Sequence, residues 1–395
     1  MSPQKKIGLA TATIVGMNAM IGAGIFSVPA ALASQVGPAG LITYVFVIIA
    51  VWFMGSSMAR LAQLYPEEGS FYTYTSQWGG HIMGLISAGA YLVGLIIAMG
   101  LLTQMAGINL HEIMPQLSSS IWGIIVLIAL IIFNILGVTF SQLGQMILIC
   151  CTIFPIITTT VICFFHGDIK NLTPFMPFGL TNVFMATKAV IFGFFGFECA
   201  ASLFSIVENP QKNVPRALMY SIFLVGLLYL GFVGSIIFAV PLAYFTDSSI
   251  SLYRILQIVL PGHPWLLGLV HFSILSAIIG TIHSMIWASS SLLVAYLKKM
   301  KNSNIQKLIS TQVITNRTAI LCIGFCIFIT FYTLNGMDLF FSLTSLFLIF
   351  AFITSMITLL TLKSEWQSGQ NIKTILGLLT ALVIFYFALE GLLLS

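Results

Sequence analysis

Charged side chains are scarce in this chain of 395 residues: Asp, Glu, Lys and Arg together make up 6% of it, whereas hydrophobic residues make up 59%. A soluble globular domain carries about 25% charged residues. The mean hydropathy of +1.06 reflects the same shortage. The composition therefore argues against a soluble enzyme or a nucleic-acid-binding domain, and it predicts a polytopic membrane protein.

The sequence is also poor in residues that build metal or disulfide frameworks. Its six cysteines fall in apolar segments, and none has metal-ligand spacing with a histidine. We interpret them as apolar packing residues. Neither a Walker loop nor a nucleophilic triad is apparent in the sequence. We therefore expect no enzymatic activity, no cofactor and no metal.

Long apolar runs are abundant. A stretch of about 20 apolar residues is long enough to cross a bilayer as a helix. The sequence predicts an all-α membrane protein with about eleven transmembrane helices in one transporter domain, 1–395. The expected spans are 9–34, 40–62, 82–108, 121–139, 143–165, 184–207, 216–241, 265–297, 318–335, 339–362 and 373–394.

Lysine and arginine are unevenly divided between the two ends of these spans. With the N-terminus inside, twelve of the fifteen lie on the inner side and three, Lys170, Lys188 and Arg254, on the outer side. Inner loops of membrane proteins are enriched in such residues. The distribution predicts a cytoplasmic N-terminus and a multi-pass protein of the inner or plasma membrane. The lipid bilayer is thus an expected partner and nucleic acid is not. The inner residues are Lys5, Lys6, Arg60, Lys212, Arg216, Lys298, Lys299, Lys301, Lys307, Arg317, Lys363 and Lys373.

Glycines interrupt the first and the sixth span. Residues 21–26 read IGAGIF, and Gly193 and Gly196 lie in the middle of the sixth span. Closely spaced glycines among β-branched residues have low helix propensity. In lipid, each unpaired backbone group costs several kcal/mol, so a break is tolerable only where it lines a protected cavity.

Breaks at matching places in two halves of a chain are typical of transporters built from inverted repeats, with a site at the bilayer midplane. We expect two five-helix repeats, at about 9–165 and 184–362, and a peripheral helix at about 373–394. An odd number of helices in each repeat makes the second repeat enter the membrane from the opposite side.

The breaks suggest how a zwitterion is held without charged side chains. Helix N-termini attract anions and C-termini attract cations. Backbone N–H groups at the first break would bind a carboxylate, and carbonyls at the sixth-span break would accept from an α-ammonium. The alternative is that the glycines only allow close helix packing. The expected substrate-binding residues are Met20, Ile21, Gly22, Ala23, Gly24, Ile25, Phe192, Phe195 and Gly196.

Two ionisable side chains inside the spans are candidates for proton coupling or gating. Glu198 is the only acidic residue of the first ten spans that lies well away from a loop. Ionisable groups there are costly and are functional candidates by default. His283 is the second candidate, because histidine titrates near neutral pH. For both residues the alternative is a structural hydrogen bond between helices. Glu390, near the outer end of the last span, is expected to snorkel.

Three motifs resemble those of the amino acid–polyamine–organocation (APC) permeases. The first is the G-[SA]-G-I-F signature, and the second is a P-x-x-G-G-x-Y-x-Y loop in which Ser70 replaces the second glycine. The third is FFGFE followed by ENP and VPR. The resemblance covers roughly residues 7–362, with the motifs at 21–26, 66–74, 194–198, 208–210 and 214–216.

This resemblance implies a LeuT-type fold with broken helices 1 and 6, usually with twelve helices rather than eleven. It associates the position of Glu198 with proton coupling or helix 6 movement, and an aromatic at Phe192 with covering the substrate. Two departures stand out. Thr152 occupies the place of a lysine found in some proton-coupled members, and Ala277 or Ser276 aligns with a sodium-binding hydroxyl. Both favour solute exchange or coupling through Glu198.

The sequence thus predicts a secondary active transporter that moves amino acids by alternating access, linked to protons or to exchange. An apolar pocket favours neutral amino acids. A polyamine, amine or cationic amino acid antiporter is an alternative, and so is a transport-inactive receptor or scaffold with the same fold. A channel would need a continuous polar lining, which the spans do not offer. The oligomeric state is left open.

Overall fold

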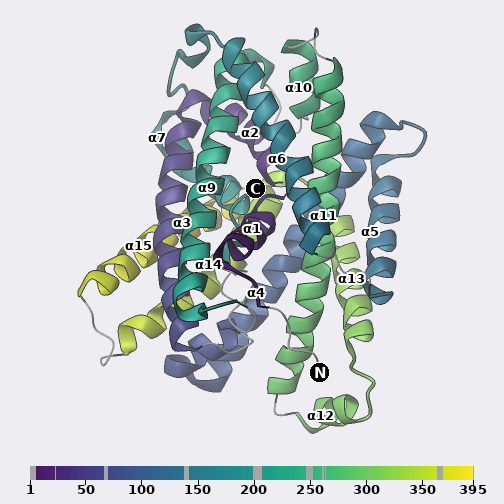
Figure 1. Ribbon diagram of the computed structural model, residues 1–395, viewed down its shortest axis with the longest axis vertical. Helices are drawn as coiled ribbons and strands as arrows, with labels where there is room; N and C mark the ends of the chain where they lie inside the picture. The colour runs from purple at the N-terminus through teal and green to yellow at the C-terminus, as the bar shows by residue number, and fades with distance from the viewer. Residues whose placement is uncertain are drawn as a thin grey trace.

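A computed structural model describes residues 6–22, 24–65, 70–137, 142–198, 207–245, 252–259, 262, 264–300, 302–362 and 368–394 (Figure 1). In these residues the regular structure is helical, apart from an isolated parallel bridge between Ile7 and Val207. The α-helices are α1 (Leu9–Met20), α2 (Gly24–Val36), α3 (Gly40–Leu64), α4 (Ser70–Ile113), α5 (Ser119–Ile135), α6 (Gln142–Phe165), α7 (Gly179–Met185), α8 (Thr187–Phe192), α9 (Pro210–Ala239), α10 (Leu252–Val259), α11 (Pro264–Lys299), α12 (Ser303–Ser310), α13 (Asn316–Thr333), α14 (Met337–Thr361) and α15 (Ser368–Leu394).

Most of the predicted spans coincide with these helices, and residues 199–206 of the sixth span lie outside the described residues. By length and composition, seven helical segments of the described residues are able to cross a membrane, and four shorter apolar helices accompany them. Large apolar side chains such as Ile128, Phe164, Phe325 and Leu382 are exposed on the outer helices. An apolar outer surface suits lipid, so the prediction of an all-α polytopic membrane protein is confirmed.

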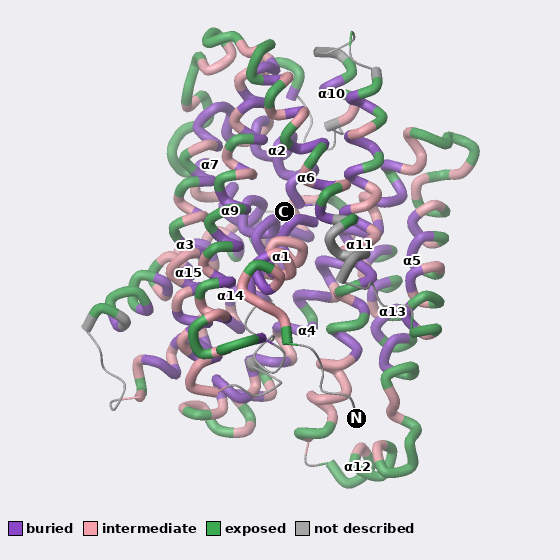
Figure 2. The backbone as a smooth tube through the Cα atoms, in the orientation of Figure 1, coloured by how far each residue is buried: buried purple, intermediate pink, exposed green. Residues whose placement is uncertain are grey.

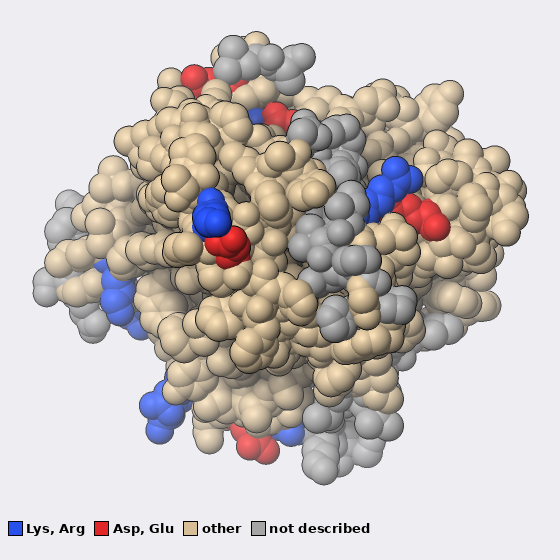
Figure 3. All heavy atoms as spheres, turned by 90° about the horizontal axis from the view of Figure 1, so that it is seen from above, with Lys and Arg blue, Asp and Glu red and all other residues tan. Residues whose placement is uncertain are grey.

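Burial is concentrated on the central helices, and α12 is largely exposed (Figure 2). Helix α4 packs against α14, α5, α11 and α13, while α9 packs against α1, α3 and α6. Helix α15 rests on α14 and α3. Few charged side chains are visible on the face seen in Figure 3. The short helices α1, α2 and α8 therefore lie within a frame of longer ones.

The interruption of the first and sixth spans is confirmed. Helix α1 ends at Met20 and α2 begins at Gly24. The sixth span is divided further than expected, because α7 and α8 are separate helices and α8 ends at Phe192. Gly196 follows with a φ of +108°, a backbone conformation that glycine adopts at little cost.

Two sequence-based interpretations need correction. The third span was expected to begin at residue 82, but α4 begins at Ser70, and two helices meet within it at Gly80 (φ 68°). The more polar residues before Gly80 form helix without forming an apolar run. Lys188, counted as a charge on the outer side, lies in α8 and is only 4% exposed.

Candidate substrate site

The break in helix 1 leaves backbone groups that other residues partly satisfy. After α1, Ile21 has φ −75° and ψ 80°, and the Gly22 N–H bonds to the Met20 carbonyl at 2.8 Å. The hydroxyl of Tyr229, on α9, donates to the same carbonyl at 2.9 Å. Ala23, a predicted carboxylate-binding residue, lies outside the described residues. The end of α1 is thus fixed from a neighbouring helix.

The contact from Tyr229 supplies a stability prediction. Tyr229 is fully buried. The substitution Tyr229→Phe keeps the volume of the side chain nearly constant and removes the hydroxyl that donates to the Met20 carbonyl. The carbonyl keeps the bond from the Gly22 N–H, so the expected loss is that of one hydrogen bond, about 0.5–1.5 kcal/mol. We expect a lower melting temperature in a thermal-shift assay. Tyr220→Phe on the same helix is the control, because Tyr220 is 50% exposed. Equal melting temperatures for the two variants would contradict the prediction.

The second break, in the sixth predicted span (called helix 6 here, and distinct from α6), follows the end of α8. The Gly193 N–H bonds to the Val190 carbonyl at 3.1 Å, and the Phe194 N–H bonds to that of Ile191 at 2.9 Å. These tight turns end the helix at Phe192, where the predicted ammonium-binding carbonyls begin. A helix C-terminus carries partial negative charge, which suits a cation.

The two breaks lie directly against each other. A Cβ atom added to Gly24 would lie 2.9 Å from the Cα atom of Gly193, and one added to Gly196 would collide with the carbonyl of Ala19. The N-terminus of α2 and the C-terminus of α8 therefore meet. Close packing, the alternative reading of these glycines, is present as well, because a side chain fits at neither position.

Glu198 lies just beyond the second break and is 7% exposed. Its Oε1 accepts from the hydroxyl of Tyr91, on α4, at 2.5 Å, and its Oε2 accepts from the Gly196 N–H at 3.1 Å. The ring of Tyr91 is stacked on that of Phe71, with centroids 4.1 Å apart. A single carboxyl thus joins the helix 6 break to the long helix α4.

The aromatic residues of the break pack against α14. The ring of Phe192 meets Phe341 edge-on, with centroids 5.2 Å apart, and that of Phe195 is stacked parallel to Phe352 at 6.5 Å. Phe192 is 7% exposed. These contacts are ordinary aromatic packing. A role of Phe192 in covering a substrate stays a prediction.

His283, on α11, contacts α5. Its Nδ1 lies 3.0 Å from the Nδ2 atom of Asn134, on α5, and the ring is 5% exposed. The α11 residue beside helix 1 is Thr281, whose Oγ1 lies 2.6 Å from a Cβ built on Gly22. The pair with Asn134 fits the alternative of an interhelical hydrogen bond, and proton coupling by His283 stays a prediction.

Sequence reasoning predicted a role for the glycines and Glu198 but did not anticipate the contacts that Tyr91, Tyr229 and Thr281 make at the breaks. The one available signal was general: a buried tyrosine hydroxyl needs a hydrogen-bond partner. The remaining predicted residues are placed around the first break, where Met20, Ile21 and Ile25 are all buried.

A polytopic helical protein with two broken helices in contact at their breaks has the architecture of a membrane transporter with discontinuous helices. The chain belongs to the amino acid permease family, whose match extends over residues 7–393. The resemblance in the sequence motifs is thereby confirmed. The fold is the LeuT-type fold of that superfamily, and the family consists of transporters rather than enzymes.

Individual relatives are distant. The chain is 25% identical over 289 residues to the branched-chain amino acid permease BcaP of Bacillus subtilis (strain 168), covering 68% of this chain and 62% of that protein. It is 26% identical over 253 residues to an aspartate-proton symporter of the same organism, covering 60% of this chain and 48% of the relative. A serine/threonine exchanger, SteT, is 26% identical over 239 residues, covering 58% and 53%. The chain thus matches between about half and two thirds of the length of these proteins.

Proposed function

We propose that this protein is a secondary active transporter for amino acids that works by alternating access around the two breaks. The substrate carboxylate binds the N–H groups at the start of α2, and its amino group binds the carbonyls at the end of α8. The contact of Gly24 with Gly193 supports this most strongly, because it brings a helix N-terminus and a helix C-terminus to one place.

Neutral amino acids are the proposed substrates. Among the described side chains at the two breaks Glu198 is the one acidic group, and its carboxyl is already engaged by Tyr91 and Gly196. A cationic side chain would need an acidic partner of its own. A cationic amino acid or polyamine antiporter is the second candidate, because Glu198 is a buried acid close to the site.

Transport is proposed to be coupled through Glu198 or by exchange of one solute for another. Thr152, at the position where some family members carry a lysine, offers no ammonium group. The names of the relatives include both a proton symporter and an exchanger. Either mechanism is compatible with a carboxyl that ties the helix 6 break to α4.

The orientation of the chain is also a proposal. We infer a cytoplasmic N-terminus from the basic residues of the inner loops. Because Lys188 is buried, Lys170 and Arg254 are the exposed basic residues on the outer side. We further propose that 9–165 and 184–362 are inverted repeats, with one broken helix at the start of each.

Exchange in proteoliposomes tests the proposed function. Purified protein is reconstituted with an unlabelled amino acid inside, and uptake of radiolabelled L-valine, L-serine, L-aspartate, L-lysine and putrescine is measured at acidic and neutral pH. We expect saturable uptake of a neutral amino acid that is accelerated by internal substrate. Uptake of L-lysine or putrescine alone would favour the second candidate. Non-saturating uptake would indicate a channel, and none at all a receptor or scaffold.

A further inference from the structure

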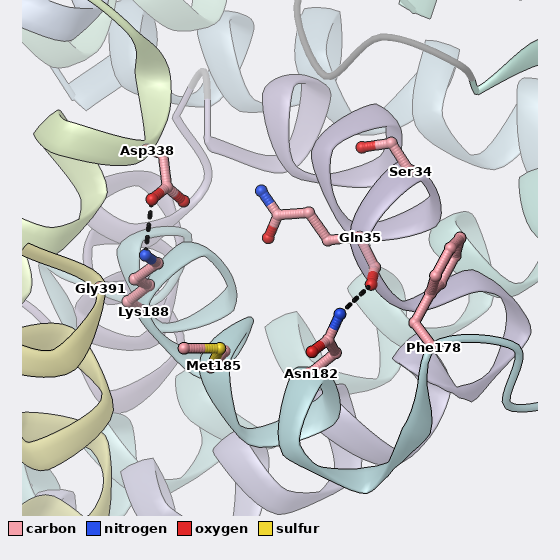
Figure 4. Close-up of a pocket in the computed structure, with 8 residues that line it drawn as sticks. All are labelled: Ser34, Gln35, Phe178, Asn182, Met185, Lys188, Asp338 and Gly391. Atoms are coloured by element: carbon pink, nitrogen blue, oxygen red, sulfur yellow. Dashed lines mark hydrogen bonds and ion pairs between the residues drawn. The ribbon is translucent and has the colours of Figure 1, made fainter. Parts of the chain in front are cut away.

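A cavity of about 310 Å³ opens where α2 ends and α7 begins, on the outer side in the proposed orientation (Figure 4). Pockets for small ligands begin at about this size. We call it the outer cavity. The residues of its lining that carry the inference are Gln35, Phe178, Asn182, Met185, Lys188 and Asp338.

The outer cavity contains an ion pair of which one member is buried. The Nζ atom of Lys188, on α8, lies 2.7 Å from the Oδ2 atom of Asp338, on α14, and the two side chains are 5% and 43% exposed. An ammonium group has three donors. Among the described residues Asp338 supplies its one acceptor. A side chain at Gly391 would collide with Nζ, so the glycine of α15 leaves the ammonium room.

Two amide side chains complete the polar lining. Asn182 Nδ2 donates to the backbone carbonyl of Gln35 at 3.2 Å. The side-chain amide of Gln35 extends into the space beside the ion pair (Figure 4), and no partner for it occurs in the described residues. The side chains of Met185 and Phe178 add apolar surface. One small hollow thus holds a cation, an anion, uncommitted amide donors and an apolar wall.

We propose that the outer cavity is a second binding site for zwitterionic amino acids. The ligand carboxylate binds the Lys188 ammonium and the Gln35 amide, its ammonium binds Asp338, and its side chain lies against Met185. A ligand with one charge would leave one member of the separated ion pair without a partner, which is costly for the buried lysine. The choice of amino acids as ligands rests on the proposed function.

The position of Lys188 connects this site with the break. Lys188 precedes Phe192 by four residues on the same half-helix, an axial distance of about 6 Å. The ion pair ties α8 to α14. A zwitterion that inserts between Lys188 and Asp338 replaces this tie with contacts of its own and frees α8 to move. The outer cavity therefore acts as a recognition site occupied before the site at the breaks.

Equilibrium binding of radiolabelled L-valine and L-serine to the purified full chain tests this proposal. We expect a binding curve with two components. Gly24→Val removes the component at the breaks, and the remainder weakens about tenfold or more when Lys188→Met or Gln35→Ala is added, because hydrogen bonds to charged groups are lost. N-acetyl-L-valine and L-valinamide, which lack one charge each, should compete poorly for this remainder.

Controls separate this proposal from the proposed function. Lys170→Met, an exposed charge elsewhere on the outer side, should leave both components unchanged. Gln35→Ala in the otherwise wild-type chain reports on the outer cavity without disturbing the ion pair. If Gly24→Val abolishes all binding, or if the Lys188 and Gln35 variants bind as their parents do, the outer cavity is not a site, while the site at the breaks stands. If only the Lys188 and Gln35 variants lose binding, the outer cavity stands and the site at the breaks fails.

Discussion

Gly24→Val is expected to abolish amino acid exchange while the protein still inserts in the membrane. The new Cβ atom would lie 2.9 Å from the Cα atom of Gly193 and 3.3 Å from the ring of Phe192, so the two breaks have to separate. Separation misaligns the N–H and carbonyl groups that are proposed to hold the substrate. Each hydrogen bond to a charged group contributes about 1.5–3 kcal/mol, so the loss of two lowers affinity at least about 100-fold.

The measurement is counterflow in proteoliposomes, together with expression level and elution volume as checks of insertion and folding. Gly268→Val is the matched control, because a Cβ on Gly268, in α11, would meet no atom within 4 Å. The control should transport as the wild type does. Near-normal exchange by Gly24→Val would mean that the close approach of the breaks has no part in transport. The glycines would then serve packing alone.

The helices and both breaks were predictable because the requirements of a membrane-spanning helix can be read from a short stretch of sequence. A span must be apolar over a fixed length, and a glycine pair weakens a helix wherever it occurs. The third span shows where this reasoning ends. The residues before Gly80 are too polar to be predicted as a span. They nevertheless form helix as part of α4, which packs against α14.

Contacts between distant residues were not predictable, because they depend on how each helix is rotated. Tyr91 reaches Glu198 and Tyr229 reaches the Met20 carbonyl from helices far along the chain. The burial of Lys188 was not predictable for the same reason. A lysine in a span is costly and was taken for an outer charge, but Asp338, 150 residues later, makes its burial tolerable.

The Glu198→Gln variant is expected to retain exchange and to lose its dependence on pH. Glutamine keeps the size of the side chain, and its one amide oxygen accepts from the Gly196 N–H. Its NH2 group then donates to the Tyr91 hydroxyl in place of the bond that the carboxyl accepts, so the tie to α4 is kept. Its amide does not exchange a proton in the range where carboxyl and imidazole groups titrate. Over that range we expect the exchange rate of the variant to vary by less than about twofold.

The pH profile of exchange in proteoliposomes, with equal pH on both sides, measures this effect. Glu390→Gln is the matched control, because it makes the same chemical change in the last helix, away from the breaks, and should keep the wild-type profile. Tyr91→Phe distinguishes a proton-binding role of Glu198 from a purely structural one. It leaves the carboxyl titratable but removes its tie to α4, so it should slow exchange and keep a pH dependence. An unchanged profile in Glu198→Gln would remove the proton role from this residue and leave His283 as the candidate to test next.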